Sequence, residues 1–275
     1  LLYGERALAR FRSAHVAVVG VGGVGSWAAE AVARTGIGRI TLVDLDDVCV
    51  SNVNRQVHSL SDAVGKPKVQ VFAERIHGIN PECLVDAVEN WVTPDSAANF
   101  VAASEPPFDA VIDAVGLASD KAAIIDACIR AGVPCVSVGG PGQKRDPTCM
   151  HVVDLANTSN DPLLGDVRRQ LRRDYGWPAA TDLSTFGVMT VSSREAPGPL
   201  PDDEEEVKVD DEDSSLSFRT DSVGTASYVT GSFGFAAAGT IAELLADDSS
   251  PATGAWYPEL RKQLGVSTSG ASATP

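Results

Sequence analysis

The sequence predicts an α/β protein with a doubly wound, mainly parallel sheet that antiparallel strands extend late in the chain. Two observations carry this prediction. Short apolar runs alternate with helical patterns from residue 16 to residue 138, a rhythm typical of strands joined by crossover helices. The run at 16–19 also ends in closely spaced glycines and passes directly into a helix, which is typical of a Rossmann-like sheet.

The predicted elements follow one another with short connections. In chain order they are strand 16–19, helix 24–35, strand 39–43, helix 66–78, strand 83–88, helix 95–103, strand 109–113, helix 119–131 and strand 134–138. Further on we expect strand 149–155, helix 161–173 and strand 186–192, the last one antiparallel at the sheet edge. Residues 1–145 then form a core, and residues 146–265 are a C-terminal extension of the same domain.

Three later segments differ in composition from the rest. Residues 196–220 contain prolines and runs of acidic residues, which repel one another and predict a mobile loop; a partner-binding acidic patch is the alternative. Residues 266–275 predict a flexible tail. Residues 223–241 carry no charge, but glycine, serine and threonine dilute their hydrophobicity. We therefore expect a helix packed inside the fold and no stable membrane contact.

The five cysteines are widely spread, and no two of them have the C-x-x-C spacing of a zinc site or redox dithiol. This usage favours reduced thiols in a reducing compartment. We expect the cytoplasm, with a mitochondrion or other organelle as the alternative, because the sequence begins at Leu1 without a methionine.

The glycine-rich turn after the first strand is the strongest local signal. Glycines let the backbone approach a ligand closely, and the helix that follows presents free N–H groups to a phosphate. The turn predicts a nucleotide site, with a purely structural tight turn as the alternative. Its glycines are Gly20, Gly22, Gly23 and Gly25.

The residues after the second strand indicate which nucleotide binds. Asp44 lies 19 residues after Gly25, where a carboxylate in such folds holds a ribose hydroxyl. The motifs Asp-x-Asp, Ser-Asn-x-x-Arg-Gln and Gly-x-x-Lys then bring Arg55 and Lys68 close behind the turn. Hydride transfer needs no such cations, whereas chemistry at the phosphates of ATP does. Taken singly, Arg55 also fits a surface ion pair and Lys68 a solvated helix residue.

This ordered set resembles the ubiquitin-activating-enzyme-like adenylating superfamily, which includes ThiF and MoeB and activates carboxylates as acyl-adenylates. The resemblance implies that the four glycines line ATP, that Asp44 holds the ribose, and that Asn54 and a Mg²⁺-associated Asp46 lie near the phosphates. It further implies that Lys68 contacts the phosphates, and that Arg55 reaches them from the second subunit of a homodimer. These two cations are the expected catalytic residues.

The strand that ends at Asp113 departs from the superfamily pattern. Its relatives end this strand in Asp-x-x-Asp, where the second aspartate serves the magnesium and the chemistry. Here that position is Gly116. Asp113 matches the first, more structural aspartate and counts among the expected cofactor-binding residues. Because Mg²⁺ needs oxygen ligands, losing a carboxylate predicts weaker metal binding, unless Asp120 or Asp46 substitutes.

Several further segments resemble one branch, the tRNA threonylcarbamoyladenosine dehydratases. They are residues 2–8, 33–38, 46–50, 52–58, 73–83, 146–148, 161–163 and 231–235. The resemblance implies that ATP adenylates the threonine carboxylate of threonylcarbamoyladenosine beside the tRNA anticodon. An atom of the same side chain then attacks the activated carbonyl, expels AMP and closes a ring. No protein nucleophile is needed, because the substrate supplies its own.

The net charge of −15 opposes binding of tRNA, which normally relies on neutralised phosphates. One predicted helix is basic nevertheless, and its arginines share a face that could grip a tRNA backbone; a solvated helix face is the alternative. They are Arg168, Arg169, Arg172 and Arg173. Two other functions stay open: an inactive nucleotide-binding scaffold, which Gly116 favours, and adenylation of a ubiquitin-like protein's C-terminus.

Overall fold

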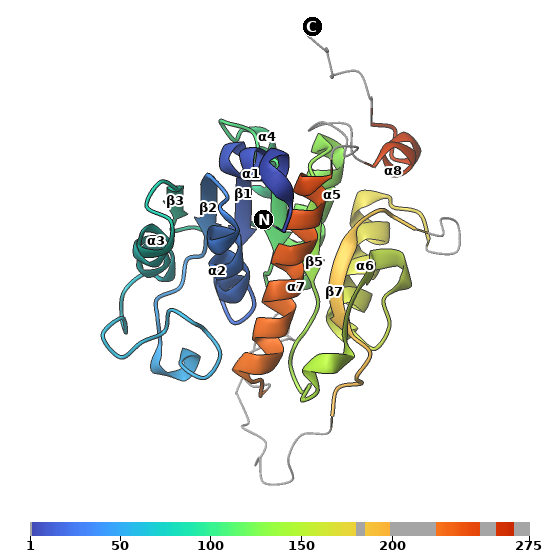
Figure 1. Ribbon diagram of the computed structural model, residues 1–275. Helices are drawn as coiled ribbons and strands as arrows, with labels where there is room; N and C mark the ends of the chain where they lie inside the picture. The colour runs from blue at the N-terminus through green and yellow to red at the C-terminus, as the bar shows by residue number, and fades with distance from the viewer. Residues whose placement is uncertain (1, 180–184, 199–223, 248–256, 267–275) are drawn as a thin grey trace, which may run out of the picture.

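The computed structural model describes residues 2–179, 185–198, 224–247 and 257–266. Most of the predicted mobile loop at 196–220 and nearly all of the predicted tail at 266–275 lie outside these residues. A seven-stranded sheet forms the centre of the molecule in the order β3-β2-β1-β4-β5-β7-β6 (Figure 1). Its strands are β1 (His15–Val19), β2 (Arg39–Val43), β3 (Leu84–Val88), β4 (Ala110–Asp113), β5 (Cys135–Val138), β6 (Met150–Asp154) and β7 (Met189–Ser193).

All neighbouring strands are parallel except β6 and β7, which confirms the predicted doubly wound sheet with an antiparallel extension. The chain builds outward from β1 in one direction to β3 and returns to place β4 on the other side of β1. This reversal separates the loops that follow β1 and β4. In open α/β sheets ligands bind at such a switch point, outside the carboxyl ends of the strands.

Helices cover both faces of the sheet and enclose two hydrophobic cores. The first core contains residues of α1 (Gly4–Ser13), α2 (Gly25–Thr35), α3 (Lys68–Ile79) and α7 (Ser227–Ala246). The second contains residues of α4 (Ala97–Ala102), α5 (Ala118–Ala131), α6 (Pro162–Tyr175) and α8 (Pro258–Gln263), together with the residue just before α8. The side chains of β1 point alternately to the two faces, so Val16 and Val18 lie in the first core and Ala17 and Val19 in the second.

The position of β7 corrects one prediction. The segment 186–192 was expected as an antiparallel edge strand, but β7 lies between β5 and β6 and is parallel to β5, while β6 is the antiparallel edge. Thr190, Ser192 and Ser193 give β7 the polar composition of an edge strand, yet all three are buried. Strand order follows from the crossover through α6, which local composition does not encode.

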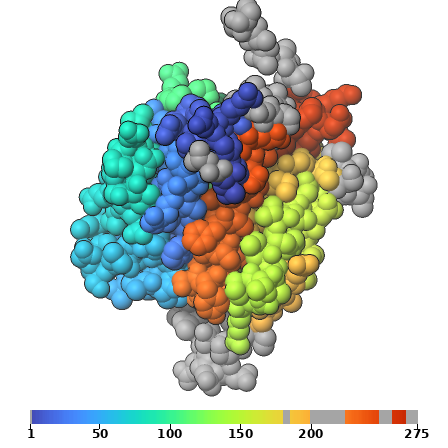
Figure 2. Space-filling view, viewed as in Figure 1, coloured from blue at the N-terminus to red at the C-terminus, as the bar shows by residue number. Residues whose placement is uncertain are grey.

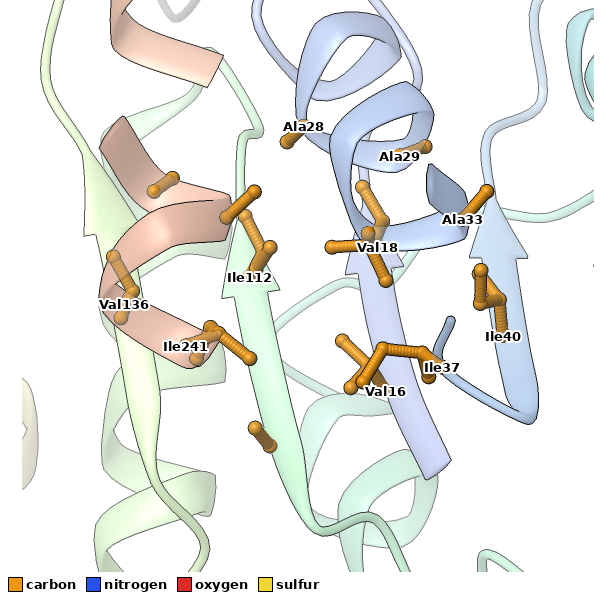
Figure 3. Close-up of a cluster of buried hydrophobic side chains, with 14 of the residues drawn as sticks. Val16, Val18, Ala28, Ala29, Ala33, Ile37, Ile40, Ile112, Val136 and Ile241 are labelled. Carbon is orange, nitrogen blue, oxygen red and sulfur yellow. The ribbon is translucent and has the colours of Figure 1, made fainter. Parts of the chain in front are cut away.

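Helix α7 is long and apolar enough to cross a membrane by length and composition, and half of its most apolar window is buried inside the fold. It runs across the sheet face next to α2, as the orange band in Figure 2 shows. Ile241 packs over Ile112 and Val136 of the sheet (Figure 3). At Gly234 a Cβ atom would lie 2.6 Å from the Val24 carbonyl oxygen, so this glycine lets α7 and α2 touch. One side of the helix packs into the fold, as the sequence predicted, while Tyr228 and Phe235 on its other side are half exposed.

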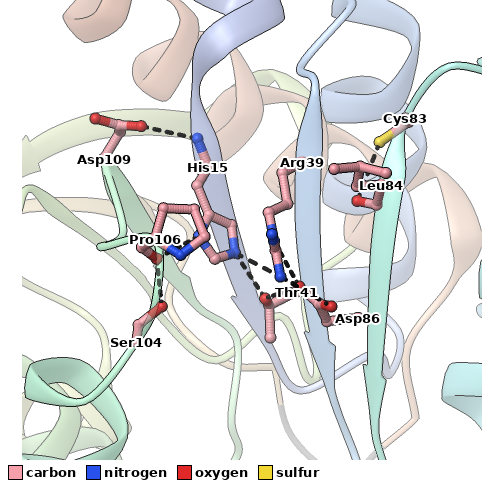
Figure 4. Close-up of polar contacts among 9 residues, drawn as sticks. All are labelled: His15, Arg39, Thr41, Cys83, Leu84, Asp86, Ser104, Pro106 and Asp109. Carbon is pink, nitrogen blue, oxygen red and sulfur yellow. Dashed lines mark hydrogen bonds and ion pairs between the residues drawn. The ribbon is translucent and has the colours of Figure 1, made fainter.

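Polar side chains fix the amino ends of β1 and β2, at the sheet edge opposite the glycine turn (Figure 4). The Nε2 atom of buried His15 lies 2.8 Å from Thr41 Oγ1, and the His15 backbone N–H donates to Asp109. Arg39 forms an ion pair with Asp86 on β3, with 2.8 Å between Nε and Oδ2. Burial lowers the pKa of His15, so its imidazole is held as a neutral part of this network.

Candidate nucleotide-binding site

The glycine turn lies between β1 and α2, and its glycines serve two purposes. Gly20 has a φ of +86°, and a Cβ at Gly25 would lie 1.7 Å from the Gly20 carbonyl oxygen. These two glycines are required by the tight passage from strand to helix. Gly22 and Gly23 are different, because added Cβ atoms would have nothing closer than 3.9 Å and 3.4 Å. Gly22 is thus open to the space above the turn, whereas Gly23 is covered by the side chains of Arg55 and Thr230 at van der Waals distance.

Asp44 follows β2 and ties the start of the turn to that strand. Its buried carboxylate accepts the Val21 N–H at 2.7 Å and the Asp46 N–H at 2.9 Å. Burial raises the pKa of Asp44, and the charge of Lys68 opposes this rise. The Asp44 carboxylate therefore lies beside the glycine turn. Its contact with a ribose hydroxyl stays a prediction.

Lys68 is the first residue of α3 and is buried, although it carries a charge. Its Nζ atom lies 2.7 Å from Asp46 Oδ2, and its backbone N–H donates to the Asp46 carbonyl at 3.0 Å. The two predicted phosphate-site residues are thus held together on one side of Asp44.

Arg55 and Asn54 lie on the connection between β2 and α3. A Cβ on Gly23 would be 3.4 Å from Arg55 Cγ, so the stem of this arginine lies beside the turn of its own chain. Its guanidinium donates through Nη1 to the Ser51 carbonyl at 2.7 Å, and delivery of Arg55 to a second subunit's site stays a prediction. Trp27 Nε1 donates to the Arg55 carbonyl at 3.0 Å, and Asn54 Nδ2 donates to the Thr225 carbonyl at 3.0 Å. The connection is therefore anchored to α2 and to the residues before α7.

Asp113 ends β4 as a fully buried carboxylate. Its Oδ2 atom lies 2.9 Å from Lys121 Nζ and 2.7 Å from Ser137 Oγ, while Oδ1 accepts the Val115 N–H at 3.3 Å. Burial raises the pKa of Asp113, and the Lys121 charge opposes that rise. Because protein donors occupy both oxygens, Asp113 fixes the loop after β4, and any contribution to nucleotide binding stays a prediction.

Gly116 lies three residues later, exposed at the same edge of the sheet. Asp120, in the first turn of α5, accepts from Ser119 Oγ at 3.1 Å, and burial raises the pKa of its carboxyl. Among the described residues no three His, Cys, Asp or Glu side chains gather as a metal site. Mg²⁺ at nucleotide sites commonly uses one or two carboxylates together with phosphate oxygens, which fits the half-exposed Asp46.

Sequence reasoning assigned no role to three buried polar residues directly after Arg55. Gln56 Oε1, both ring nitrogens of His58 and Ser59 Oγ have no hydrogen-bond partner among the described residues. Gln56 Nε2 lies nearest to the open side of Gly22. Burial, together with the charges of Lys68 and Arg75, lowers the pKa of His58 to about 4. The motif Arg-Gln-x-His was visible in the sequence, but it lies in a loop rich in polar residues and gave no signal that these side chains are buried.

The four arginines of α6 do not form one uniform face. Arg168 donates through Nη1 to the Leu155 carbonyl at 3.1 Å, and Arg169 is ion-paired with Asp166. Arg173 is ion-paired with Asp174, with 2.7 Å between Nε and Oδ1. Arg172 has no acidic partner in the part of the chain that the structure describes. Acidic residues of the helix itself therefore neutralise Arg169 and Arg173, but not Arg168 and Arg172.

Comparisons with known proteins identify the family of this chain. The model of the ThiF family matches residues 1–191. The tRNA threonylcarbamoyladenosine dehydratase of Escherichia coli K12 is 51% identical over 195 residues, which cover 71% of each chain. The chain belongs to the ThiF family, in its tRNA threonylcarbamoyladenosine dehydratase branch. The resemblance stated from the sequence is thereby confirmed.

Two further relatives extend the match over most of the chain. The dehydratase of the same name from Haemophilus influenzae is 38% identical over 244 residues, which cover 89% of this chain and 90% of that protein. The crystal structure of the E. coli dehydratase TcdA in complex with ATP is 44% identical. It superposes with a TM-score of 0.77 and covers 89% of this chain and 90% of that one.

Proposed function

We propose that this ThiF-family chain is an ATP-dependent tRNA threonylcarbamoyladenosine dehydratase. The threonine carboxylate of the modified nucleoside attacks the α-phosphorus of ATP, and pyrophosphate leaves. A nucleophilic atom of the same side chain then attacks the acyl-adenylate carbonyl, loses its proton and displaces AMP. The substrate loses one water and gains a ring.

One observation carries this proposal: two cations flank a glycine turn that is open at Gly22, at the switch point of the sheet. Lys68 and Arg55 would stabilise the charge that develops on the phosphoryl oxygens, and the N–H groups at the start of α2 would bind phosphate. Asp44 would accept from the ribose hydroxyls, while Asn54 would lie near the phosphates. The solved TcdA complex with ATP supports a triphosphate ligand.

Magnesium would enter with ATP and neutralise charge on the phosphate oxygens. We assign Asp46 as its protein ligand, because Asp46 is half exposed at the open side of the site. Asp113 would act indirectly, through the loop after β4 that it holds.

We further propose that two copies of the chain associate. Trp27, Tyr228 and Phe235 line a surface hollow between α2 and α7, and the last two are half exposed, which is unusual for large apolar side chains. A second copy would cover them. The reaction requires tRNA and ATP, which favours the cytoplasm or an organelle with its own tRNAs.

A nucleotide-binding scaffold is the second candidate, and Gly116 favours it. A glycine supplies no carboxylate to a metal at the edge of the sheet where ATP would bind. Such a scaffold would bind ATP through the same turn and leave tRNA unchanged.

The deciding experiment incubates the protein with ATP, Mg²⁺ and tRNA that carries threonylcarbamoyladenosine, followed by mass analysis of the nucleosides. Loss of one water from the modified nucleoside, together with AMP release, supports the dehydratase. Unchanged nucleoside with measurable ATP binding supports the scaffold. Gly116→Asp sharpens the comparison, because a restored carboxylate should raise turnover and lower the Mg²⁺ concentration needed for half-maximal activity.

A further inference from the structure

Three of the four α6 arginines line a single pocket, and the fourth does not. Arg168, Arg169 and Arg172 surround a hollow of about 250 Å³ whose other walls include Trp177 and Phe186. Arg173, one residue further along, is not part of this lining and pairs with Asp174. The pocket is therefore a local feature of one helix face.

The apolar wall of this pocket is fixed by its own contacts. Trp177 is buried, donates through Nε1 to Asp126 at 2.8 Å and contacts the Phe186 ring edge-on at 5.3 Å. Gly176 ends α6 in the left-handed conformation, and the Trp177 N–H bonds back to the Leu171 carbonyl. A ligand would thus meet a preformed surface, which lowers the entropy lost on binding.

The charge inside the pocket is not balanced by the residues described. The Arg169 charge is offset by Asp166, but Arg172 has no acidic partner among these residues. Burial lowers the pKa of Arg168, and the nearby Arg172 lowers it further, although Asp161 acts in the opposite direction. A concentration of positive charge within a chain of net charge −15 would be relieved by an anion.

We propose that this pocket binds a backbone phosphate of the tRNA, with Arg168 and Arg172 as phosphate ligands and the apolar wall against the adjoining sugar. This inference rests on the proposed function for the identity of the ligand. Arginine suits the role, because its planar fork matches phosphate oxygens. The strong negative charge elsewhere explains why the contact would be confined to one pocket rather than spread over a basic surface.

Helix α6 leads from the sheet edge that carries the candidate nucleotide site towards the pocket. This helix begins after Asp161, whose carboxylate accepts the Gly140 N–H at 3.1 Å just beyond the carboxyl end of β5. Arg172 comes eleven residues later, which corresponds to about 16 Å along a helix. A nucleic-acid strand carries several phosphates over that length. A tRNA whose modified nucleoside reaches the sheet edge could therefore run along α6 into the pocket.

The test compares Arg172→Gln with Arg173→Gln, which remove the same charge from the same helix inside and outside the pocket. Binding of tRNA is measured at several salt concentrations, and KM for tRNA and for ATP is measured separately. We expect Arg172→Gln to weaken tRNA binding about tenfold and to reduce the salt slope by about one. Arg173→Gln should change tRNA binding less than about twofold, and KM for ATP should stay constant in both. Arg12→Gln, which changes an exposed arginine of α1, controls for the change in net charge.

Two outcomes would contradict the proposal that this pocket binds a tRNA phosphate. One is an equal effect of Arg172→Gln and Arg173→Gln on tRNA binding, because only general charge would then matter. The other is competition by inorganic phosphate for the pocket without any effect of Arg172→Gln on tRNA, because the site would then take a free anion. Since binding is measured without turnover, an inactive protein would refute the proposed function and leave this test intact.

Discussion

Lys68 and Asp46 form an ion pair of 2.7 Å in which the lysine side chain is 5% exposed and the aspartate 51% exposed. The buried ammonium is held in one place by the fold, while solvent reaches the pair only from the aspartate side. A fixed charge that needs no rearrangement stabilises a transition state better than a mobile one. The candidate site therefore holds its cation in position before ATP binds.

Loss of this cation should reduce catalysis more than folding. We expect Lys68→Gln to lower kcat about 100-fold or more, the usual loss when one charge-stabilising group is removed. Asp46→Asn should leave Lys68 in place and raise the Mg²⁺ concentration needed for half-maximal turnover. Both are read from AMP release at a series of Mg²⁺ concentrations. A Lys68→Gln protein with normal kcat would remove Lys68 from the catalytic set.

The two kinds of glycine should respond differently to alanine. A Cβ on Gly25 would lie 1.7 Å from a backbone oxygen, so Gly25→Ala should cost about 3 kcal/mol or more in unfolding free energy. Gly22→Ala meets nothing closer than 3.9 Å and should fold normally, yet weaken ATP binding about tenfold by blocking close approach. Thermal melting and ATP titration separate the two effects. Normal ATP affinity in Gly22→Ala would contradict the assignment of this turn.

The buried pair Asp113–Lys121 should show strong coupling. Lys121→Met leaves an unpaired carboxylate at a fully buried position, which should destabilise the fold by about 3–5 kcal/mol. Adding Asp113→Asn removes that charge and should recover part of the loss. Urea unfolding of the two single variants and the double variant measures the coupling. Additive losses would mean that the two side chains act independently.

His58 should make stability fall at acid pH. Its pKa is about 4 in the folded chain, below the ordinary value of 6.5, so the unfolded chain binds more protons between these values. Stability is thus full above about pH 6.5 and declines towards pH 4, by on the order of 3 kcal/mol. His58→Leu should remove this decline, and at neutral pH it should keep or raise stability because two unpartnered nitrogens disappear. Urea unfolding at several pH values, with the exposed His77→Leu as control, tests this.

The parts that could be predicted from the sequence are local. The glycine turn, Asp44 and Lys68 were found from the number of residues between them along a single βαβ unit, which the sequence gives directly. The pairing of Asp113 with Lys121 could not be predicted, because it depends on how α5 packs against β4 and β5. The predicted place of β7 was wrong for a related reason: the crossover through α6 puts β7 between β5 and β6, and local composition does not encode this crossover.

The α6 arginines show the same limit on a smaller scale. Helical periodicity correctly predicts that the four arginines are neighbours. It does not show which of them form ion pairs with the aspartates of the same helix. Gln56 and His58 were visible in the sequence as polar residues in a loop. Their burial without partners is a tertiary property, and only the folded chain reveals it.

The hydroxyl of Thr230 lies 3.4 Å from the Arg55 carbonyl, a contact between residues 175 positions apart. During synthesis the segment that carries Arg55 can therefore be held by Trp27 of α2 at once, but it gains the Thr230 contact only after α7 has left the ribosome. Local contacts in the first βαβ unit can form early, whereas contacts of such long range form slowly. A chain that ends before α7 would therefore lack this second anchor on the Arg55 segment.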